Sequence, residues 1–189
     1  MIAVMAVAAI SANAQVWIGG NIGVQTNKTS FDGNKLSSNT SFEIAPEIGY
    51  NLSDKWAVAL ELAYSHTGNG EINFAGESVK GYLNSFSVKP FARFAYVKSG
   101  NFSAFVDGGI NYTTSHVSGF SNNLNSFGVF FAPGFSYAVS NKVSLVAHLG
   151  DLSYDYTFVK VPGTDKKATN NAFNFQLFNG VSFGAYYNF

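Results

Sequence analysis

The chain has 189 residues, a formal net charge of zero and no cysteine; 16% of its residues are aromatic and only 12% are charged. The lack of cysteine excludes disulfide frameworks, thiol nucleophiles and cysteine metal sites, and the zero net charge gives no electrostatic reason to bind nucleic acid. With 19 Gly and 19 Phe, the composition favours strands and turns over helices, since Gly is a poor helix former. These observations predict one all-β domain.

The N-terminus predicts an export signal. Residues 1–10 are apolar, and Ala12-Asn13-Ala14 before Gln15 has the small-x-small pattern of a secretory cleavage site. A run of about ten apolar residues is too short for a membrane-spanning helix. The positively charged n-region of a complete signal is missing, which suggests a truncated start. We therefore expect residues 1–14 to be a signal peptide and residues 15–189 to be the mature domain.

Beyond Gln15, apolar residues recur at every second position, the period of a strand with two different faces. Eight such segments begin near Val16, Ser41, Trp56, Phe86, Phe102, Phe127, Val143 and Phe173. In the seventh segment the apolar parity changes, which predicts a bulge near Gly150.

The connections between these segments alternate in length. Three are tight turns, near Ser53-Asp54, Ser99-Gly100 and Asn141. Four are long and rich in Asn, Ser, Gly and Lys, and we expect them to be loops: 27 to 40, 66 to 82, 114 to 125 and 159 to 171. An even number of strands with this alternation is typical of an antiparallel, up-and-down outer-membrane β-barrel with short periplasmic turns and long external loops. A soluble β-sandwich is the alternative, because its strands alternate in the same way.

The placement of aromatic residues favours the barrel. Those of the outward parity at the turn ends of the strands are Tyr50, Trp56, Tyr96, Phe102, Tyr137 and Phe189. A second set, near the loop ends, is Tyr64, Phe86, Tyr112, Phe127 and Phe173. Two aromatic bands are expected where a barrel crosses the headgroup layers of a membrane. Trp17 has the opposite parity and does not fit this girdle.

Three prolines mark an internal repeat. Pro46, Pro90 and Pro133 lie 44 and 43 residues apart, and each is followed four residues later by an aromatic residue. This spacing is that of one β-hairpin. A strand proline leaves a ladder carbonyl without its donor, which is costly in lipid, so we expect a bulge or local water at each proline.

The Ala-Asn-Ala pattern, the segments "APEIGY" and "SNKVSL", the eight alternating strands and the terminal "FGAYYNF" together resemble the family of small outer-membrane β-barrels typified by OmpX and the OmpA membrane domain, in a form common in Bacteroidetes. The resemblance implies an integral outer-membrane location, with membrane lipid and the barrel-assembly machinery as partners. It also implies that the C-terminal aromatic pattern is an assembly signal, carried by Phe183, Ala185, Tyr187 and Phe189.

Charged residues of the inward parity occur on neighbouring strands, and they are Glu43, Glu47, Glu61, Lys89, Arg93 and Asp107. Charges inside a narrow barrel are expected to pair, because an unpaired buried ion is expensive. We therefore predict a structural ion-pair cluster that fills the lumen. The alternative, a path for ions or a site for a polar solute, needs a wider interior.

Nothing in the sequence supports catalysis strongly. Some small barrels modify lipids with Ser, His and acid groups. Here the available histidines are His66, His116 and His148, and none has convincing triad spacing with a serine. No metal-ligand cluster or phosphate-binding glycine loop is present, so we expect no cofactor. The sequence predicts a non-enzymatic barrel that supports membrane integrity and presents four external loops to ligands or surfaces; a small-solute channel and, less favoured, a lipid-modifying enzyme are the alternatives.

Overall fold

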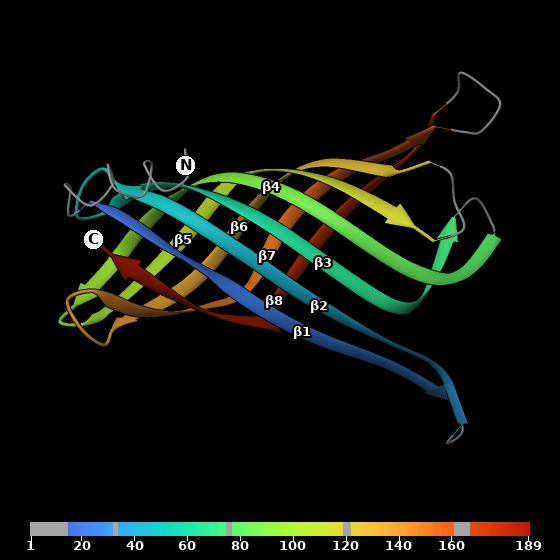
Figure 1. Ribbon diagram of the computed structural model, residues 1–189, viewed down its shortest axis with the longest axis horizontal. Helices are drawn as coiled ribbons and strands as arrows, with labels where there is room; N and C mark the ends of the chain where they lie inside the picture. Colours follow the sequence, from blue (N-terminus) through green and yellow to red (C-terminus); the bar gives the residue numbers. More distant parts are fainter. Residues whose placement is uncertain (1–14, 32–33, 75–76, 119–121, 161–166) are drawn as a thin grey trace, which may run out of the picture.

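Eight antiparallel strands close into a barrel, and each pairs with its neighbours in chain order in the computed structural model (Figure 1). The strands are β1 (Val16–Phe31), β2 (Asn34–Asn51), β3 (Trp56–Phe74), β4 (Glu77–Ser99), β5 (Phe102–Val117), β6 (Leu124–Ala138), β7 (Val143–Lys160) and β8 (Lys167–Asn188). The prediction of an all-β, eight-stranded up-and-down barrel is confirmed. The structure describes residues 15–31, 34–74, 77–118, 122–160 and 167–189, so the expected signal peptide lies outside the described residues. Within these ranges, no helix is long and apolar enough to cross a membrane.

The strands are longer than the sequence predicted. The expected loop 27 to 40 is mostly strand, because pairing between β1 and β2 continues to Phe31↔Asn34. Likewise, the expected loop 66 to 82 is mostly strand, because pairing between β3 and β4 continues to Phe74↔Glu77. The expected loops 114 to 125 and 159 to 171 are shortened in the same way. Runs of polar residues therefore continue the strands here instead of ending them.

Two of the tight turns share one hydrogen-bonding pattern. The Ser53 hydroxyl accepts the backbone N–H of Trp56 at 3.1 Å, and the Ser140 hydroxyl accepts that of Val143 at 3.1 Å. In the third turn, Gly100 has a φ of 56°, a left-handed conformation that glycine adopts readily. All three turns lie at the end of the barrel that carries the C-terminus (Figure 1).

The bulge predicted near Gly150 is present. Pairing between β7 and β8 shifts from His148↔Ser182 to Gly150↔Leu177, so β8 contributes the longer stretch. On the other side of β7, the register with β6 shifts between Phe131 and Gly134, which places Pro133 in an irregularity.

At the other two strand prolines the expected bulge is not seen. Beside Pro46, pairing between β2 and β3 passes from Ile44↔Tyr64 to Glu47↔Glu61 with equal spacing on both strands. Beside Pro90, β4 and β5 behave in the same way. At these two prolines the ladder skips residues without a register shift. The proline is thus accommodated by local loss of pairing toward the next strand.

The two faces of the wall differ as the alternation predicted. Large apolar side chains cover the outside, and a smaller buried group occupies the lumen: Trp17, Phe91, Ala95, Phe105, Val146 and Tyr186. Trp17, the exception to the expected girdle, is only 3% exposed because its inward parity places it inside the barrel.

Candidate functional site

A compact layer of side chains crosses the lumen in the half of the barrel nearer the tight turns. Its centre is the guanidinium of Arg93, whose carbon lies 3.9 Å from the ring centroid of Phe105. The ring centroids of Tyr186 and Trp17 are 5.1 and 5.2 Å from the same carbon. These distances are within the range of cation–π attraction, which strengthens when the cation is removed from water. We call Trp17, Arg93, Phe105 and Tyr186 the plug layer.

Hydrogen bonds tie the plug layer to strands on opposite sides of the barrel. Arg93 donates from Nε and Nη2 to the two carboxylate oxygens of Asp107, both at 2.7 Å. Arg93 Nη2 also donates to the Tyr186 hydroxyl at 3.0 Å, and that hydroxyl donates to Glu47 Oε2 at 2.8 Å. Asn21 Nδ2 donates to Glu47 Oε1. Because Arg93 comes from β4 and Tyr186 from β8, this chain of bonds spans the lumen directly.

His148 extends this network to β7. Its Nε2 lies 2.9 Å from Asp107 Oδ2, and its ring meets that of Phe105 edge to face at 5.4 Å between centroids. Asp107 therefore joins Arg93 on β4 to His148 on β7. A carboxylate that is only 3% exposed needs partners of this kind, because an unpaired buried charge is costly.

Glycines on the neighbouring strands make room for the large rings. Trp17 is paired with Gly49, Phe105 with Gly134 and Tyr186 with Gly19. A Cβ atom at any of these three glycines would overlap the ring opposite. Small inward-facing residues opposite the rings therefore leave the space that the plug layer fills.

The plug layer separates two cavities. The outer cavity, of about 640 Å³, has Glu47, Phe91, Asp107 and His148 at its inner end. The turn-side cavity, of about 190 Å³, is lined by all four residues of the plug layer. The lumen thus holds two cavities, with the side chains of the plug layer and their partners packed between them.

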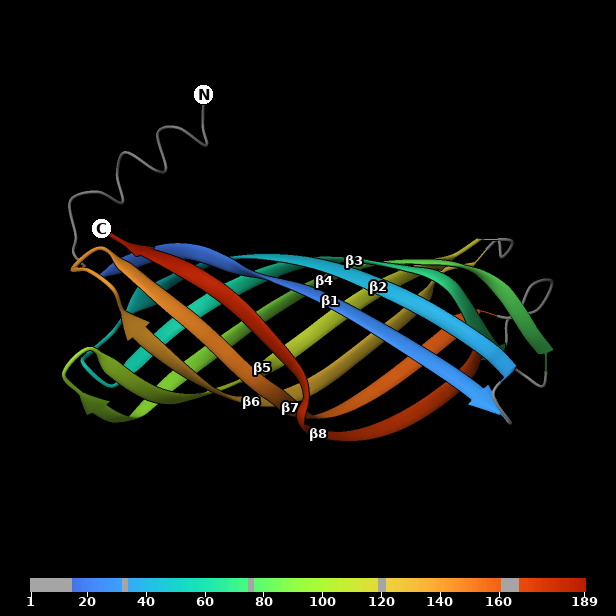
Figure 2. The same cartoon turned by 90° about the horizontal axis from the view of Figure 1, so that it is seen from below.

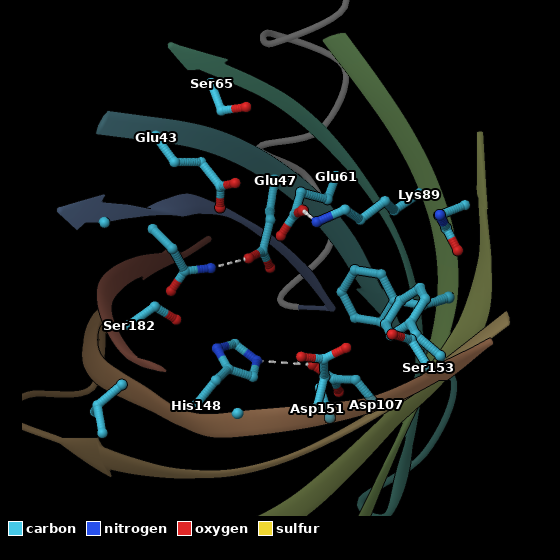
Figure 3. A pocket seen from close by; sticks show the side chains of 18 of the residues that line it. Glu43, Glu47, Glu61, Ser65, Lys89, Asp107, His148, Asp151, Ser153 and Ser182 are labelled. Atoms are coloured by element: carbon cyan, nitrogen blue, oxygen red, sulfur yellow. Dashed lines mark hydrogen bonds and ion pairs between the residues drawn. The ribbon is translucent and has the colours of Figure 1, made fainter. Parts of the chain in front are cut away.

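The outer cavity is strongly acidic (Figure 3). The carboxylates that line it are Glu43, Glu47, Glu61, Asp107, Asp151 and Asp155. Lys89 is the one lysine or arginine among the lining residues described, and its Nζ lies 2.7 Å from Glu61 Oε1. The carboxylates of Glu43 and Asp151 make no hydrogen bond or close ion pair with the described residues, although both lie within electrostatic reach of Lys89. The cavity therefore favours cationic groups.

The charged residues singled out in the sequence all face the lumen, and their direct partners differ. Arg93 pairs with Asp107 in the plug layer, and Lys89 pairs with Glu61 in the outer cavity. Glu47 is bound by the amide of Asn21 and the hydroxyl of Tyr186 instead of by a cation. Sequence reasoning missed these partners, although the inward parity of Trp17 and Tyr186 was a readable signal that rings enter the lumen.

His66 and His116 each pair with an asparagine, whereas His148 pairs with Asp107. Nδ1 of His66 lies 2.7 Å from Asn84 Oδ1, and Nδ1 of His116 lies 3.1 Å from Asn123 Oδ1. No serine hydroxyl is hydrogen-bonded to a histidine in the described contacts. The described stretches also hold no group of three His, Asp or Glu side chains suited to a metal ion.

The residues expected at the membrane interface lie on the outer wall. Those at the turn end are 38–53% exposed: Tyr50, Trp56, Tyr96, Phe102 and Tyr137. Of the C-terminal set, Phe183 and Tyr187 are exposed on the same wall. The backbone N–H of Phe189 donates to the carbonyl of Val16 at 3.0 Å, so the last residue takes part in barrel closure.

A closed antiparallel barrel with an apolar outer wall, aromatic side chains toward both ends and a polar lumen defines a class, the integral outer-membrane β-barrel proteins. The chain belongs to the outer membrane protein beta-barrel domain family, whose model matches residues 1–189. It is accordingly an integral protein of the outer membrane. No curated protein matches its sequence.

Solved structures show the same fold at low sequence identity. The outer membrane protein OprG from Pseudomonas aeruginosa is 16% identical with a TM-score of 0.55, over 93% of this chain and 96% of that one. Neisserial surface protein A (NspA) is 16% identical with a TM-score of 0.52, over 94% and 98%. The outer membrane protein AlkL, solved in DMPC lipid bilayers, is 13% identical with a TM-score of 0.51, over 94% and 89%. At these identities the likeness is one of fold alone.

Proposed function

We propose that this outer-membrane barrel is a non-enzymatic protein without a through-channel, which supports membrane integrity and holds four external hairpins for contact with ligands or neighbouring surfaces. The observation that carries this proposal is the plug layer, whose side chains pack and hydrogen-bond across the lumen between two cavities. An unchanged lipid A mass on overexpression is the expected result for a barrel without lipid-modifying activity.

The energetics of the plug layer support a sealed lumen. To open the lumen, Arg93 would have to leave both Asp107 and the surrounding rings. Removing one partner from a buried ion pair costs roughly 3–5 kcal/mol. A cost at the lower end of that range keeps an open state below about one molecule in a hundred, since each 1.4 kcal/mol is a factor of ten.

Planar-bilayer recording tests the seal. We expect the wild-type protein to show no steady conductance. The double variant Trp17→Ala/Phe105→Ala removes two rings of the plug layer and should give a small, steady conductance, whereas Lys89→Ala, in the wall of the outer cavity, should not. Steady conductance of the wild-type protein would overturn the sealed barrel and favour the small-solute channel.

The external hairpins are the natural contact surface in this proposal. From Tyr64, on the outer wall, β3 runs ten more residues to Phe74, a length of about 30 Å at the usual rise of a strand. Pairing with β4, with one irregularity between Thr67 and Gly70, supports this extension to its end. Replacing residues 27–39 or 69–80 by short turns should leave the heat-dependent gel mobility of the barrel intact and reduce cell autoaggregation and adhesion to polystyrene. Unchanged adhesion of a double-shortened variant would contradict the surface role.

We also propose that Phe183, Tyr187 and Phe189 form the signal read by the barrel-assembly machinery. The Phe189→Ala substitution should slow the appearance of the folded, heat-modifiable band in cells while leaving spontaneous folding into lipid vesicles nearly unchanged. Tyr137→Ala is the matched control, since Tyr137 is an outward aromatic residue at the same end of the barrel. Equal assembly rates for Phe189→Ala and the wild-type protein would remove this role.

A further inference from the structure

The junction between the first and last strands is only partly closed. β1 and β8 pair from Trp17↔Asn188 to Ile22↔Phe183, although β1 continues to Phe31 and β8 begins at Lys167. Beyond the last pair, the β1–β2 hairpin and the β7–β8 hairpin separate, and both views show the divergence (Figures 1 and 2). We call the junction beyond Ile22 and Phe183 the seam.

Side-chain exposure marks the same place independently of backbone pairing. The five most exposed large apolar residues described all belong to β1 or β8: Val24 at 73%, Phe173 at 70%, Phe183 at 65%, Ile22 at 63% and Phe175 at 62%. The others do not exceed 57%. Val24, Phe173 and Phe175 lie beyond the last β1–β8 pair, and Ile22 and Phe183 form that last pair. The high exposure therefore falls at the end of the β1–β8 pairing and beyond it.

The outer cavity reaches the seam. Gly23 and Val24 of β1 and Val181 and Ser182 of β8 are among its lining residues. Val24 and Val181 are also exposed on the outer wall, so apolar surface leads from the membrane to the edge of the cavity. Strand edges without a ladder partner need another source of hydrogen bonds in lipid.

The chemistry on the two sides of the seam differs sharply. Outside it lie Ile22, Val24 and Phe183; inside it lies a carboxylate-rich cavity where Glu43 and Asp151 make no hydrogen bond with the described residues. A volume of about 640 Å³ is within the usual range for small-molecule sites. A molecule with an apolar chain and a cationic head can contact the apolar residues outside the seam and the carboxylates inside it.

We propose that the seam admits single-chain amphiphiles with a primary amine head from the membrane into the outer cavity. The ammonium group lies in the outer cavity, which Glu43 and Asp151 line from opposite sides, and the hydrocarbon chain lies in the seam against Ile22, Val24 and Phe183. This binding activity is separate from the proposed sealed scaffold, because it uses the outer cavity and leaves the plug layer closed.

A disulfide across the seam tests the route. Gly23 and Ser182 occupy the positions that follow Ile22↔Phe183 in register, and the chain has no native cysteine to interfere. The test variant is Gly23→Cys/Ser182→Cys, bridged by oxidation or by a short bifunctional thiol reagent. The control is Ser41→Cys/Thr67→Cys, a directly paired position on β2 and β3 whose hydroxyls are 2.9 Å apart and which lines the same cavity.

The probe is dodecylamine with a diazirine on its chain, added to the protein in phosphatidylcholine vesicles, and the sites of photolabelling are mapped by mass spectrometry. We expect labelling at residues 22–24 and 181–183. Bridging the seam should lower the photolabelling by about tenfold, which is an ordinary size for an effect of one site on another. Reducing the bridge should restore the labelling. Bridging the control pair should change it by less than about twofold. Full labelling of the bridged seam variant would overturn the route.

A second arm tests the recognition of charge. The matched diazirine-bearing dodecanoic acid should label the cavity about tenfold less than the amine, and Glu43→Gln/Asp151→Asn should remove most of that difference. Equal labelling by amine and acid in the wild-type protein would overturn the proposed ligand class. Conductance reports only the plug layer, so a failure here is distinguishable from a failure of the sealed scaffold.

Discussion

The two halves of the lumen share one strand pattern and yet differ in packing. In the turn-side half, Trp17, Phe105 and Tyr186 fill the space around Arg93, and β1 pairs with β8. In the outer half, the inward positions carry short polar residues such as Ser65 and Ser153, and a cavity remains. The comparison shows that alternation decides which face a side chain occupies, whereas side-chain size decides whether the barrel is sealed there.

The largest expected effect comes from the ion pairs of the two halves. Arg93→Met leaves the buried carboxylate of Asp107 without its main partner and should lower the free energy of unfolding by roughly 3–5 kcal/mol. Lys89→Met breaks a pair that faces the outer cavity, and should cost less than about 1 kcal/mol. Guanidinium unfolding in lipid vesicles, followed by tryptophan fluorescence, measures both. Equal losses would show that the outer cavity is as dry as the plug layer.

Two inward-facing glycines, one in each half, test whether the turn-side half is packed more tightly than the outer half. A methyl group at Gly49 would overlap the Trp17 ring, so Gly49→Ala should cost roughly 1–3 kcal/mol through overpacking. At Gly23 the nearest atom to an added Cβ is Glu43 Cβ at 3.8 Å, an ordinary contact. Gly23→Ala should therefore leave the unfolding midpoint nearly unchanged. A similar loss for both variants would contradict the assignment of open space to the outer half.

The smallest effect is expected at the tight turns that end the sealed half. Ser53→Ala removes the hydroxyl that accepts the N–H groups of Lys55 and Trp56, and should cost about 0.5–1 kcal/mol. Ser99→Ala, at a turn residue whose hydroxyl has no described hydrogen bond, is the control and should be neutral. If both variants unfold at the wild-type midpoint, the shared turn pattern adds no stability.

Much of the architecture could be predicted because its determinants are local. The two-residue period fixed the strand count and the outward face, and the parity change beside Gly150 located a bulge. The partners inside the lumen could not be predicted, because they depend on strand tilt and on the register of closure. Those quantities bring Arg93 of β4 to Tyr186 of β8, and no local pattern encodes them.

The errors also have a physical origin. Runs of Asn, Ser, Gly and Lys indicate loops in a soluble protein, but the pairing Gly70↔Gly81 shows that such residues continue a hairpin here. Trp17 did not fit the aromatic girdle because a tryptophan can also fill a lumen when glycine lies opposite.

The contact between Trp17 and Tyr186 has a consequence for the order of folding. Their ring centroids are 4.4 Å apart, although one residue lies in the first strand and the other in the last. This stacking completes only when the two ends of the chain meet, and contacts between distant parts of a chain form slowly. The fluorescence of Trp17 should therefore report the closing step, because the surroundings of its indole change when β1 and β8 come together.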